Sequence, residues 1–525
     1  MVYILPFHPP LSTANCRAAR QVCAKVSHGG DLFGIMGGEQ AEVRHIPVCA
    51  MYPQSKKCRF GMKQNRREFL KGTAWMLGAA TVAGCVIDKP LAGGGTGTMC
   101  NFSVPPMKKI RVGFIGIGER GTAAVKRVTL LPGIETAALC DLRPAQVDAA
   151  KKGLQEKKKP GAMKVYAGKN DSWKGVCDDD GVDVVYIATP AGLHAEMEVY
   201  ALKAGKHVLS EVPGAQTVEE AWEIVETCEK SRRHCMMLEN CCYGEMEMFA
   251  WNLVHKGLLG TVTHAEGGYI HNLVWRHLEN NFRNRARFNG GTVHRYGNTY
   301  PTHALGPICM YMDMNRGDRM ERIVSMSSLS AAHAEFAAAK YKPEDWQNRL
   351  QWLTGDMNTS IIKTAKGRTI MMQVDQSTPR PYSRINLIQG TKGCFYDYPP
   401  RLALAKTPGE HAGWLSDANF AKAREEHKHP LWKSAGAIAK KVGGHGGMDF
   451  IMDLRWAYCL QNGLPLDMDV YDLASWSAIV PCSAESDRMG GAPVEIPDFT
   501  RGGWRTAKPV SIGDVDLAKM GLDKC

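Results

Sequence analysis

The chain has 525 residues, of which 44% are hydrophobic and 22% charged; this length and composition are ordinary for a globular protein of two or three domains. Its formal net charge is +12, but residues 1–84 hold 11 Lys or Arg and 4 Asp or Glu, a net +7 that leaves +5 for the rest. Since no basic face with interleaved aromatic residues occurs, the sequence argues against a nucleic-acid-binding protein.

An export signal is the first element that the sequence predicts. From Met62 the chain runs MKQNRREFLKGTAWMLGAATVAGC, with basic residues first, a mild apolar run over 74–83 and small residues before Cys85. The run is too short to span a membrane and is typical of a signal peptide, although a short apolar helix is the simpler alternative. Arg66 and Arg67 resemble the twin-arginine export signature, and Val-Ala-Gly-Cys resembles a lipoprotein cleavage box. We therefore expect export by the twin-arginine machinery to the periplasm, either free or as a lipoprotein anchored at Cys85.

The position of this signal sets the first boundaries. Residues 1–61 precede it and have scattered Cys, Pro and Gly without apolar periodicity, so we interpret them as a mis-assigned or disordered extension. The true start would then be Met62. Residues 62–84 form the export signal, and residues 85–107, which include AGGGTGT, are expected to be a flexible tether.

A glycine-rich turn follows the first predicted strand of the folded part. Ile110–Ile115 is an apolar, β-rich run, the next six residues fit G-x-G-x-x-G, and Thr122–Val128 can begin a helix. Gly116 permits the tight turn, Gly118 lets the backbone approach a pyrophosphate, and Gly121 allows close helix packing. Free N–H groups at the start of the helix would face the phosphates. This context predicts a dinucleotide site.

Asp141 ends the next predicted strand, IETAALCD. A carboxylate there can accept hydrogen bonds from both ribose hydroxyls of NAD and repels a 2′-phosphate, which favours NAD over NADP. Arg143 tempers that preference. In the alternative interpretation, Asp141 only opens the turn before Pro144.

Two further strands place an acidic residue at the same edge. Val182–Ala188 is a predicted strand whose loop ends at His194, and a helix is expected around Ala195–Ala204. The stretch KHVLSEVPGA then supplies another strand that ends at Glu211. This β-α-β alternation predicts a parallel sheet, whose ligands bind beyond the carboxyl ends of the strands. Glu211 is therefore expected to border an active site rather than the core.

The order of these motifs is familiar. GFIGIGERG, CDLRP, VDVVYIATPAGLH and GKHVLSEVP together resemble the Gfo/Idh/MocA family, which joins a Rossmann domain to a second α/β domain with an open, mostly antiparallel sheet. In ordinary sugar dehydrogenases of that family the last motif is E-K-P, and its Lys shuttles the proton of the oxidised hydroxyl. Here that position is Val212, and an aliphatic side chain cannot transfer a proton.

The second half of the chain offers other proton carriers. Asn240 and Tyr243 follow an apolar run, Tyr269 lies in AEGGYIHN, and GNTYPTHALGP contains Tyr300 and His303. If a helix begins after Pro301, the last two share a face. His303 titrates in the useful range, although a lone His is often only a satisfied core residue.

Two later stretches add polar candidates. In TPRPYSRINLIQGTKG, Tyr382 lies near two prolines before a strand, and Arg380 and Arg384 either orient a polar ligand or are solvated strand residues. In GGHGGMDFIMDLRWAYCL, His445 lies near the start of an expected amphipathic helix.

These segments narrow the resemblance. EVP, MMLENCCY, GGYIHN, GNTYPTHALGP, TPRPYSRINLIQGTKG and HGGMDF resemble glycoside hydrolase family 109, the NAD-dependent α-N-acetylgalactosaminidases, over about residues 108–480. The resemblance implies a tightly held NAD that is reduced and re-oxidised in each turnover. Hydride leaves C3 of the sugar, the ketone acidifies the C2 proton, and the group at C1 is eliminated. Water then adds, and the ketone is reduced back.

The resemblance also implies site residues. To the three glycines of the turn, Gly116, Gly118 and Gly121, it adds NAD contacts at Glu119, Arg120, Asp141, Ala191, Gly192, Leu193, His194, Glu211, Val212, Asn240 and Tyr300. It implies substrate contacts at Tyr269, Arg285, Tyr300, Pro301, Thr302, His303 and Tyr382. We expect Tyr243 and His303 to transfer the protons; which one takes the hydroxyl proton and which the C2 proton stays open.

The predicted protein is thus an α/β glycosidase with a Rossmann domain over 108–230, a catalytic α/β domain over 231–490 and a tail over 491–525. A conventional NAD(P)-dependent sugar or cyclitol dehydrogenase that uses His303 is the main alternative, and a non-catalytic sugar sensor is the other. Since no zinc spacing or His-Glu-x-x-His occurs, we expect no metal. A glycoside is the expected partner, and a homo-oligomer is compatible with the sequence.

Overall fold

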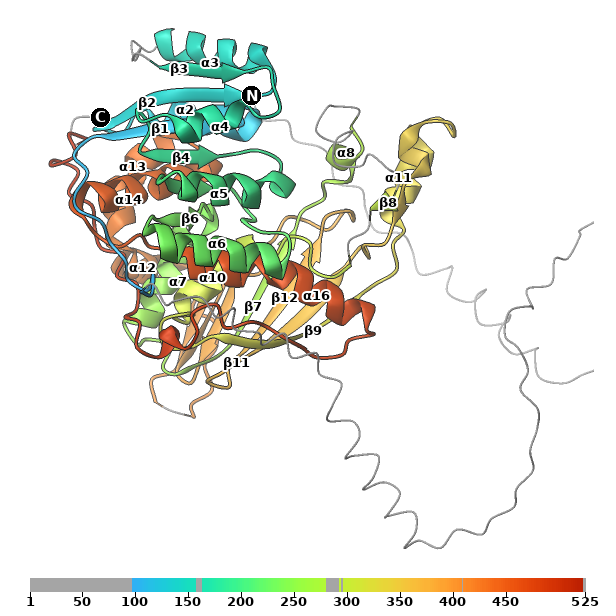
Figure 1. The fold of residues 1–525 in the computed structure, drawn as a ribbon. Coiled ribbons are helices and arrows are strands. Elements are labelled where there is room, and N and C mark those ends of the chain that lie inside the picture. The colour runs from blue at the N-terminus through green and yellow to red at the C-terminus, as the bar shows by residue number, and fades with distance from the viewer. Residues whose placement is uncertain (1–96, 157–162, 280–291, 294–295, 408, 523–525) are drawn as a thin grey trace, which may run out of the picture. The chain divides into compact units, whose positions relative to one another are not determined.

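The computed structural model describes residues 97–156, 163–279, 292–293, 296–407 and 409–522 (Figure 1). The extension and export signal expected before Cys85, and Cys85 itself, lie outside the described residues. The chain divides after Ala92, and every element below belongs to the unit that begins at Gly93. Among the helices of the described ranges, none is long and apolar enough to cross a bilayer.

The first half forms a parallel six-stranded sheet in the order β3-β2-β1-β4-β5-β6. Its central strands are almost fully buried, as expected of a sheet that helices cover on both faces. The strand order reverses between β1 and β4, which creates the crevice where ligands of such folds bind. The strands are β1 (Ile110–Ile115), β2 (Ile134–Asp141), β3 (Lys164–Ala167), β4 (Val184–Ile187), β5 (His207–Ser210) and β6 (Cys235–Met237), and the helices are α2 (Glu119–Val128), α3 (Pro144–Glu156), α4 (Ser172–Asp178), α5 (His194–Lys203) and α6 (Val218–Ser231).

This sheet extends beyond the boundary expected at residue 230. Helix α6 begins at a capping box formed by Thr217 and Glu220 and ends at Arg232, whose φ of 51° turns the chain back. The chain then enters β6, which pairs with β5. The three residues of β6, Cys-Met-Met, are too few to show a strand period, which is why the boundary was placed too early.

The second half forms an eight-stranded sheet in the order β15-β14-β13-β7-β12-β11-β9-β16. All neighbouring strands are antiparallel except β7 and β12, so the expected mostly antiparallel sheet is confirmed. Strand β16 comes from the expected tail, which therefore belongs to this domain. The strands are β7 (Val262–Ile270), β9 (Met320–Ser327), β11 (Asn358–Thr364), β12 (Thr369–Asp375), β13 (Leu387–Gly390), β14 (Gly393–Tyr396), β15 (Arg401–Leu404) and β16 (Val494–Glu495).

Helices cover one face of this second sheet. Alternate residues of β11 are buried, as expected when one face of a strand lies on the core. Helix α10 lies against β7 (Figure 1), where a Cβ on Gly267 would come within 2.9 Å of Ala304 and Ile308. Helix α16 lies against β9, while α15 packs on α6 and β6 of the first half. The longer helices of the second half are α7 (Glu245–His255), α10 (Thr302–Tyr311), α12 (Asp417–His427), α13 (Pro430–Val442), α14 (Met448–Asn462), α15 (Val470–Ser477) and α16 (Ile479–Arg488).

Smaller elements complete the described part. Helices α8 (Val274–His277) and α11 (Ala332–Lys340) share a small apolar cluster of their own, which includes Val274, Leu278 and Ala337. The others are a two-stranded sheet, β8 (Thr292–Val293) with β10 (Gln351–Trp352), and the 3-10 turns η1 (Ala191–Leu193), η2 (Asn240–Tyr243), η3 (Trp346–Arg349), η4 (His445–Gly447) and η5 (Gly503–Arg505).

The segment before β1 is not the flexible tether that its glycines suggested, at least over residues 97–107. Met99 is 2% exposed, and its N–H donates to the hydroxyl of Tyr471. The side chain of Asn101 makes two hydrogen bonds with the backbone of Lys508, at 3.1 and 2.8 Å. This buried Met and these hydrogen bonds fix a segment whose composition alone suggested a linker.

Candidate active site

The glycine-rich turn after β1 has the close packing that its sequence implied. Gly116 has a φ of +86°, and a Cβ there would lie 2.8 Å from the backbone of Ala188. A Cβ on Gly121 would lie 1.9 Å from the carbonyl oxygen of Gly116. Gly118 is the N-cap of α2, and a Cβ there would meet only the Arg143 guanidinium, at 3.8 Å, so the backbone can approach a phosphate. The turn therefore fits a dinucleotide.

Asp141 lies at the carboxyl end of β2 and is 7% exposed. One carboxylate oxygen accepts the N–H of Ile117 in the glycine-rich turn, at 2.8 Å, and the other accepts the N–H of Arg143, at 2.8 Å. The side chain thus opens the turn before Pro144 and also borders the glycine-rich turn. Both interpretations of this residue are compatible with its position.

The loop after β4 holds four of the expected cofactor contacts. Ala191, Gly192 and Leu193 form η1, whose Leu193 is exposed. His194 is instead buried, with its two ring nitrogens 2.9 Å from the carbonyl oxygens of Pro213 and Thr189. It therefore joins the loops after β4 and β5 rather than lining open space.

Glu211 belongs to a network that links both halves of the molecule. Arg120 of α2 contacts Glu211 at 2.6 Å and Asp449 of α14 at 2.7 Å. Asp449 also accepts the side-chain amide of Asn240, at 2.6 Å, and contacts His445 at 3.0 Å. Burial alone would raise the pKa of Asp449, but the hydrogen bond from His445 and the charge of Arg120 hold it well below its usual range. Three segments, α2, η2 and η4, thereby contact one carboxylate on α14.

Two other expected contacts lie at the edge of this network. Glu119 is largely exposed at the start of α2 and forms an ion pair with Arg276 of α8. Val212 follows Glu211 and packs against the apolar core. Its side chain stands where the dehydrogenases of the resembled family carry their Lys, so proton transfer needs another residue.

An aromatic cluster on β7, on α10 and before β13 provides such residues. The ring of Tyr269 lies 4.7 Å from that of Tyr300 and 5.3 Å from that of His303, centroid to centroid. The hydroxyl of Tyr300 is 3.4 Å from Nε2 of His303. His271 contacts the Tyr269 hydroxyl at 3.0 Å and lies 5.0 Å from the ring of Tyr382. The structure thus gathers Tyr269, Tyr300, His303 and Tyr382, as expected.

Helix α10 explains part of this arrangement. It begins directly after Pro301, as the sequence predicted, so Tyr300 and His303 lie on one side of its first turn. Pro301 and Thr302 are buried at this turn. Those two residues therefore position their neighbours rather than line open space.

Glu239 is a residue that the sequence analysis missed. It is fully buried, and its two oxygens lie 2.8 and 3.0 Å from Nδ1 of His303. Burial would raise the pKa of Glu239, but the charge of His303 and its hydrogen bond lower the pKa below the usual value. With Nδ1–H donated to Glu239, Nε2 of His303 is left as the acceptor beside Tyr300. Glu239 follows β6 at the carboxyl edge of the parallel sheet, just as Glu211 follows β5. This position is the sequence signal by which Glu239 could have been predicted.

Tyr300 holds its proton firmly. Burial raises the pKa of Tyr300 well above its ordinary value, and the nearby charge of Glu211 adds to that rise. The Tyr300 hydroxyl is therefore neutral near pH 7 and can donate a hydrogen bond. The N–H of Leu238, directly before Glu239, donates to the carbonyl oxygen of Ser210, directly before Glu211, at 2.7 Å. Glu239 and its partner His303 therefore lie near the end of β5.

Tyr243 does not join this cluster, contrary to its expected role in proton transfer. It is fully buried, and its hydroxyl donates to Asp467 at 3.0 Å. Asp467 in turn pairs with Arg455 at 2.7 Å. The turn η2 begins at Asn240, which contacts Asp449, and carries Tyr243 round to a different set of partners. Of the two expected proton carriers, only His303 therefore lies in the aromatic cluster.

The Arg384 side chain is buried and hydrogen-bonded within the protein rather than solvated. It is 8% exposed, its Nε donates to Glu247 at 3.1 Å, and it donates to the Tyr382 hydroxyl at 2.8 Å. Arg384 thereby holds Tyr382 at the edge of the cluster. Arg285, the remaining expected substrate contact, lies outside the described residues.

Glu239, Cys241 and His303 form a group that could hold a metal ion, with ligand atoms within 4.8 Å of one another. The direct contact between Glu239 and Nδ1 of His303 accounts for their closeness without an ion. The Cys241 thiol is buried, and burial raises its pKa well above the usual value, which disfavours a thiolate ligand. The absence of a metal stays a prediction.

Family models match most of the described chain. Residues 110–239 match the oxidoreductase family with the NAD-binding Rossmann fold, and residues 243–506 match the C-terminal domain of glycosyl hydrolase 109. The first match ends at Glu239, which agrees with β6 as the last strand of the parallel sheet.

Whole-chain relatives agree with these matches. A glycosyl hydrolase family 109 protein of Shewanella pealeana is 42% identical over 86% of this chain and 99% of its own length. A protein of Shewanella oneidensis named alpha-N-acetylgalactosaminidase is 42% identical over 85% of this chain and 98% of its own.

Solved structures share the fold at lower identity. An oxidoreductase domain protein of Kribbella flavida superposes with a TM-score of 0.56 at 20% identity, over 75% of this chain and 100% of its own. Levoglucosan dehydrogenase in complex with NADH and levoglucosan does so with a TM-score of 0.56 at 18% identity, over 74% and 100%. With the family 109 model over its second half and relatives at 42% identity over their whole length, this chain belongs to glycosyl hydrolase family 109, with an NAD-binding Rossmann domain.

Proposed function

We propose that this chain is an α-N-acetylgalactosaminidase that keeps its NAD through each turnover. The name of the Shewanella oneidensis relative supports the substrate. The observation that carries the chemistry is the chain of contacts from Glu239 through His303 to Tyr300, near the end of β5, where Glu211 and Val212 follow. A proton acceptor stands there in place of the missing Lys, on the second domain.

The residues divide the work as follows. Nε2 of His303 takes and returns a substrate proton, since Glu239 holds the opposite nitrogen and stabilises the protonated ring. Tyr300 donates a hydrogen bond to a sugar oxygen. Tyr269 and Tyr382 provide aromatic faces and hydroxyls that orient the sugar.

NAD fits the glycine-rich turn, which a Cβ at Gly116 or Gly121 would fill. When bound, it would supply the group that accepts a hydride from the sugar and returns it. Arg120 and Asn240 share Asp449, and this contact fixes the rim of the site around the cofactor. Since the same molecule is reduced and restored, catalysis needs no free dinucleotide.

The test is turnover of p-nitrophenyl α-N-acetylgalactosaminide by protein purified without added cofactor, with absorbance of NADH followed in parallel. We expect nitrophenol without net NADH. A His303→Gln protein that still contains NAD should release little. Nitrophenol absent, with NADH growing when NAD and free sugars are added, would instead indicate the dehydrogenase alternative.

Export stands on the sequence alone. The twin-arginine motif at Arg66 and Arg67 and the box ending at Cys85 support a periplasmic enzyme, anchored by lipid at Cys85. Twin-arginine transport carries folded proteins, which suits an enzyme that must load NAD before export. Changing Arg66 and Arg67 to Lys should keep the protein in the cytoplasmic fraction, and mass spectrometry of the mature N-terminus would reveal a lipid. A homo-oligomer also stays a prediction, which light scattering would test.

A further inference from the structure

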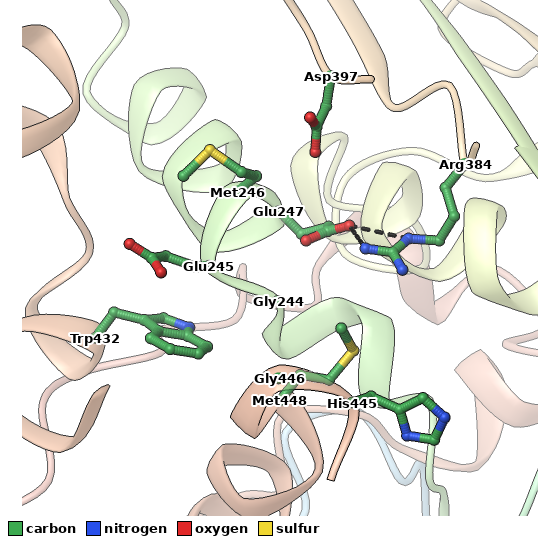
Figure 2. A pocket seen from close by; sticks show the side chains of 10 residues that line it. All are labelled: Gly244, Glu245, Met246, Glu247, Arg384, Asp397, Trp432, His445, Gly446 and Met448. Atoms are coloured by element: carbon green, nitrogen blue, oxygen red, sulfur yellow. Dashed lines mark hydrogen bonds and ion pairs between the residues drawn. The ribbon is translucent and has the colours of Figure 1, made fainter. Parts of the chain in front are cut away.

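A cavity of about 200 Å³ lies next to the aromatic cluster. Figure 2 shows it between the start of α7, the turn η4 with the start of α14, the segment before β13 that carries Arg384, and the turn after β14 that carries Asp397. Such a volume holds roughly six or seven waters, or a short chain of a few heavy atoms. Met246, Met448 and Trp432 give it apolar walls.

The cavity and the aromatic cluster share a wall. Arg384 lines the cavity and donates to the hydroxyl of Tyr382, whose ring lies 6.5 Å from that of Tyr269. His445 lines it on the other side and contacts Asp449 of the network around Glu211. Because Arg384 borders both the cavity and Tyr382, the cavity lies beside the position at which the tyrosines would hold a sugar.

Most of the charges that line the cavity neutralise one another. Glu247 pairs with Arg384, and the two side chains point toward each other in Figure 2. Glu245 is surrounded by Arg424 at 2.8 Å and Lys440 at 3.0 Å. Both glutamates therefore already form ion pairs with basic side chains of the protein.

Asp397 differs from these two carboxylates. It is 7% exposed, and it accepts a hydrogen bond from the N–H of Tyr398, at 2.7 Å. Within the described ranges, no basic side chain lies within ion-pair distance of it. In Figure 2 its carboxyl group points toward the space between Glu247 and Arg384. A buried carboxylate that forms no ion pair is costly, and a ligand that brings a positive donor would relieve that cost.

The ionisation of Asp397 is compatible with this role. Burial first, and then the charge of Glu247, raise the pKa of Asp397 to about 6, while Arg384 and Arg424 oppose the rise. Above neutral pH the side chain is therefore mostly a carboxylate. At the same pH an alkylammonium group keeps its charge.

We propose that this cavity is a leaving-group subsite, in which Asp397 binds a primary ammonium group carried by the aglycone. The apolar wall of Met246, Met448 and Trp432 contacts the short alkyl chain that leads to the ammonium group. This inference rests on the proposed function, since it assigns a preference to the same glycosidase site.

The experiment compares two α-N-acetylgalactosaminides that differ in one group, the 4-aminobutyl and the 4-hydroxybutyl glycoside. Release of the free sugar gives kcat/KM for each at pH 7.5. We expect the wild-type enzyme to favour the aminobutyl glycoside by about tenfold, the size expected of a charge-assisted contact in a buried site. Asp397→Asn should bring the ratio near one. Glu425→Gln, which removes an exposed carboxylate from α12, should leave the ratio unchanged.

A second measurement needs no variant. n-Butylammonium should inhibit p-nitrophenyl α-N-acetylgalactosaminide turnover more strongly than n-butanol at equal ionic strength. Equal inhibition by both, or an aminobutyl preference that persists in Asp397→Asn, would overturn the subsite. If the wild-type enzyme turns over none of these glycosides, the proposed function itself fails, so the two failures are distinguishable.

Discussion

In the proposed mechanism, proton transfer depends on the pair formed by Glu239 and His303. A buried carboxylate that holds one ring nitrogen fixes both the tautomer and the direction of the other nitrogen. We therefore regard Glu239 as a positioning residue, because its contact is with His303 rather than with substrate.

Glu239→Gln should lower kcat by roughly 100-fold, since an uncharged amide stabilises the protonated ring less well. KM and bound NAD should change little, because neither the tyrosines nor the glycine-rich turn contacts the altered charge. Steady-state kinetics with p-nitrophenyl α-N-acetylgalactosaminide measure this split. A matched fall in NAD content would mean that Glu239 only supports the fold.

Glu198 of α5 is 0% exposed and is not among the proposed site residues. Burial raises its pKa to about 8, although a hydrogen bond with Ser210 opposes the rise. Between the usual value of 4.5 and about 8, the folded protein keeps a proton that the unfolded chain has lost. The contribution of this group to the free energy of unfolding is therefore complete below pH 4.5 and falls as pH rises toward 8.

Glu198→Gln should remove that dependence while it preserves the side-chain volume. Relative to the variant, the wild-type protein should lose a few kcal/mol of stability between pH 5 and pH 8, since each pKa unit is worth about 1.4 kcal/mol. Urea unfolding at both pH values measures the difference. If the stabilities of the wild-type and Glu198→Gln proteins changed with pH in parallel, Glu198 would not be a buried neutral acid. The kcat of Glu198→Gln should equal that of the wild type, so this variant also serves as a control for Glu239→Gln.

Some of these residues were predictable and others were not. Glu211, Asn240, Tyr300 and His303 could be found because they follow apolar strands or precede a helix. The orientation of the Tyr243 side chain could not be predicted from the sequence. It depends on a hydrogen bond to Asp467, which is far along the chain. The role of Asp449 has the same origin in distant contacts with Arg120 and Asn240.

Among the elements, the turn between β1 and α2 tolerates least change. The 1.9 Å approach of a Gly121 Cβ to the Gly116 carbonyl means that any side chain forces the turn apart. Gly121→Ala should cost about 1–3 kcal/mol of stability and abolish NAD retention. Gly153→Ala in α3, where a Cβ meets nothing within 4 Å, is the matched control and should be neutral or slightly stabilising. NAD content after gel filtration and thermal unfolding give both readouts; full NAD content in Gly121→Ala would contradict the assignment.

The sequence predicted long elements better than short ones. Strands β1 and β2 have the bounds expected from their apolar runs. Strand β6, with three residues, and β16, with two, carry too little periodicity to be seen. Their pairing with β5 and β9 depends on contacts between segments that the sequence alone does not connect.

For the whole molecule, the two sheets share one continuous apolar core, and NAD would bind where they meet. Removal of NAD should therefore lower the Tm of the entire unit in one transition. Added NAD should raise the Tm in a concentration-dependent way. At an NAD concentration of 100 times Kd, the free energy of unfolding should increase by about 2.7 kcal/mol. Calorimetry of stripped and reloaded protein measures this. Separate transitions, with only one sensitive to NAD, would mean that the halves unfold independently.

The fold class could be predicted because the order of the motifs is distinctive and each motif sits on the expected strand or loop. The eight-stranded sheet was expected only through the family resemblance, since its strand order follows no local pattern. Export and lipidation concern residues outside the described part and remain predictions.

The reciprocal hydrogen bonds between Asn101 and Lys508 make the folded unit almost a ring. Since its first and last segments already touch, a short peptide could join them, and the chain could be opened elsewhere. The largely exposed stretch 409–414, between β15 and α12, offers such an opening. In such a circularly permuted protein the elements would follow one another in a different order along the chain, while every contact around Asp449 would be kept. Its activity would show whether the site depends only on the final architecture or also on the order in which the elements are synthesised.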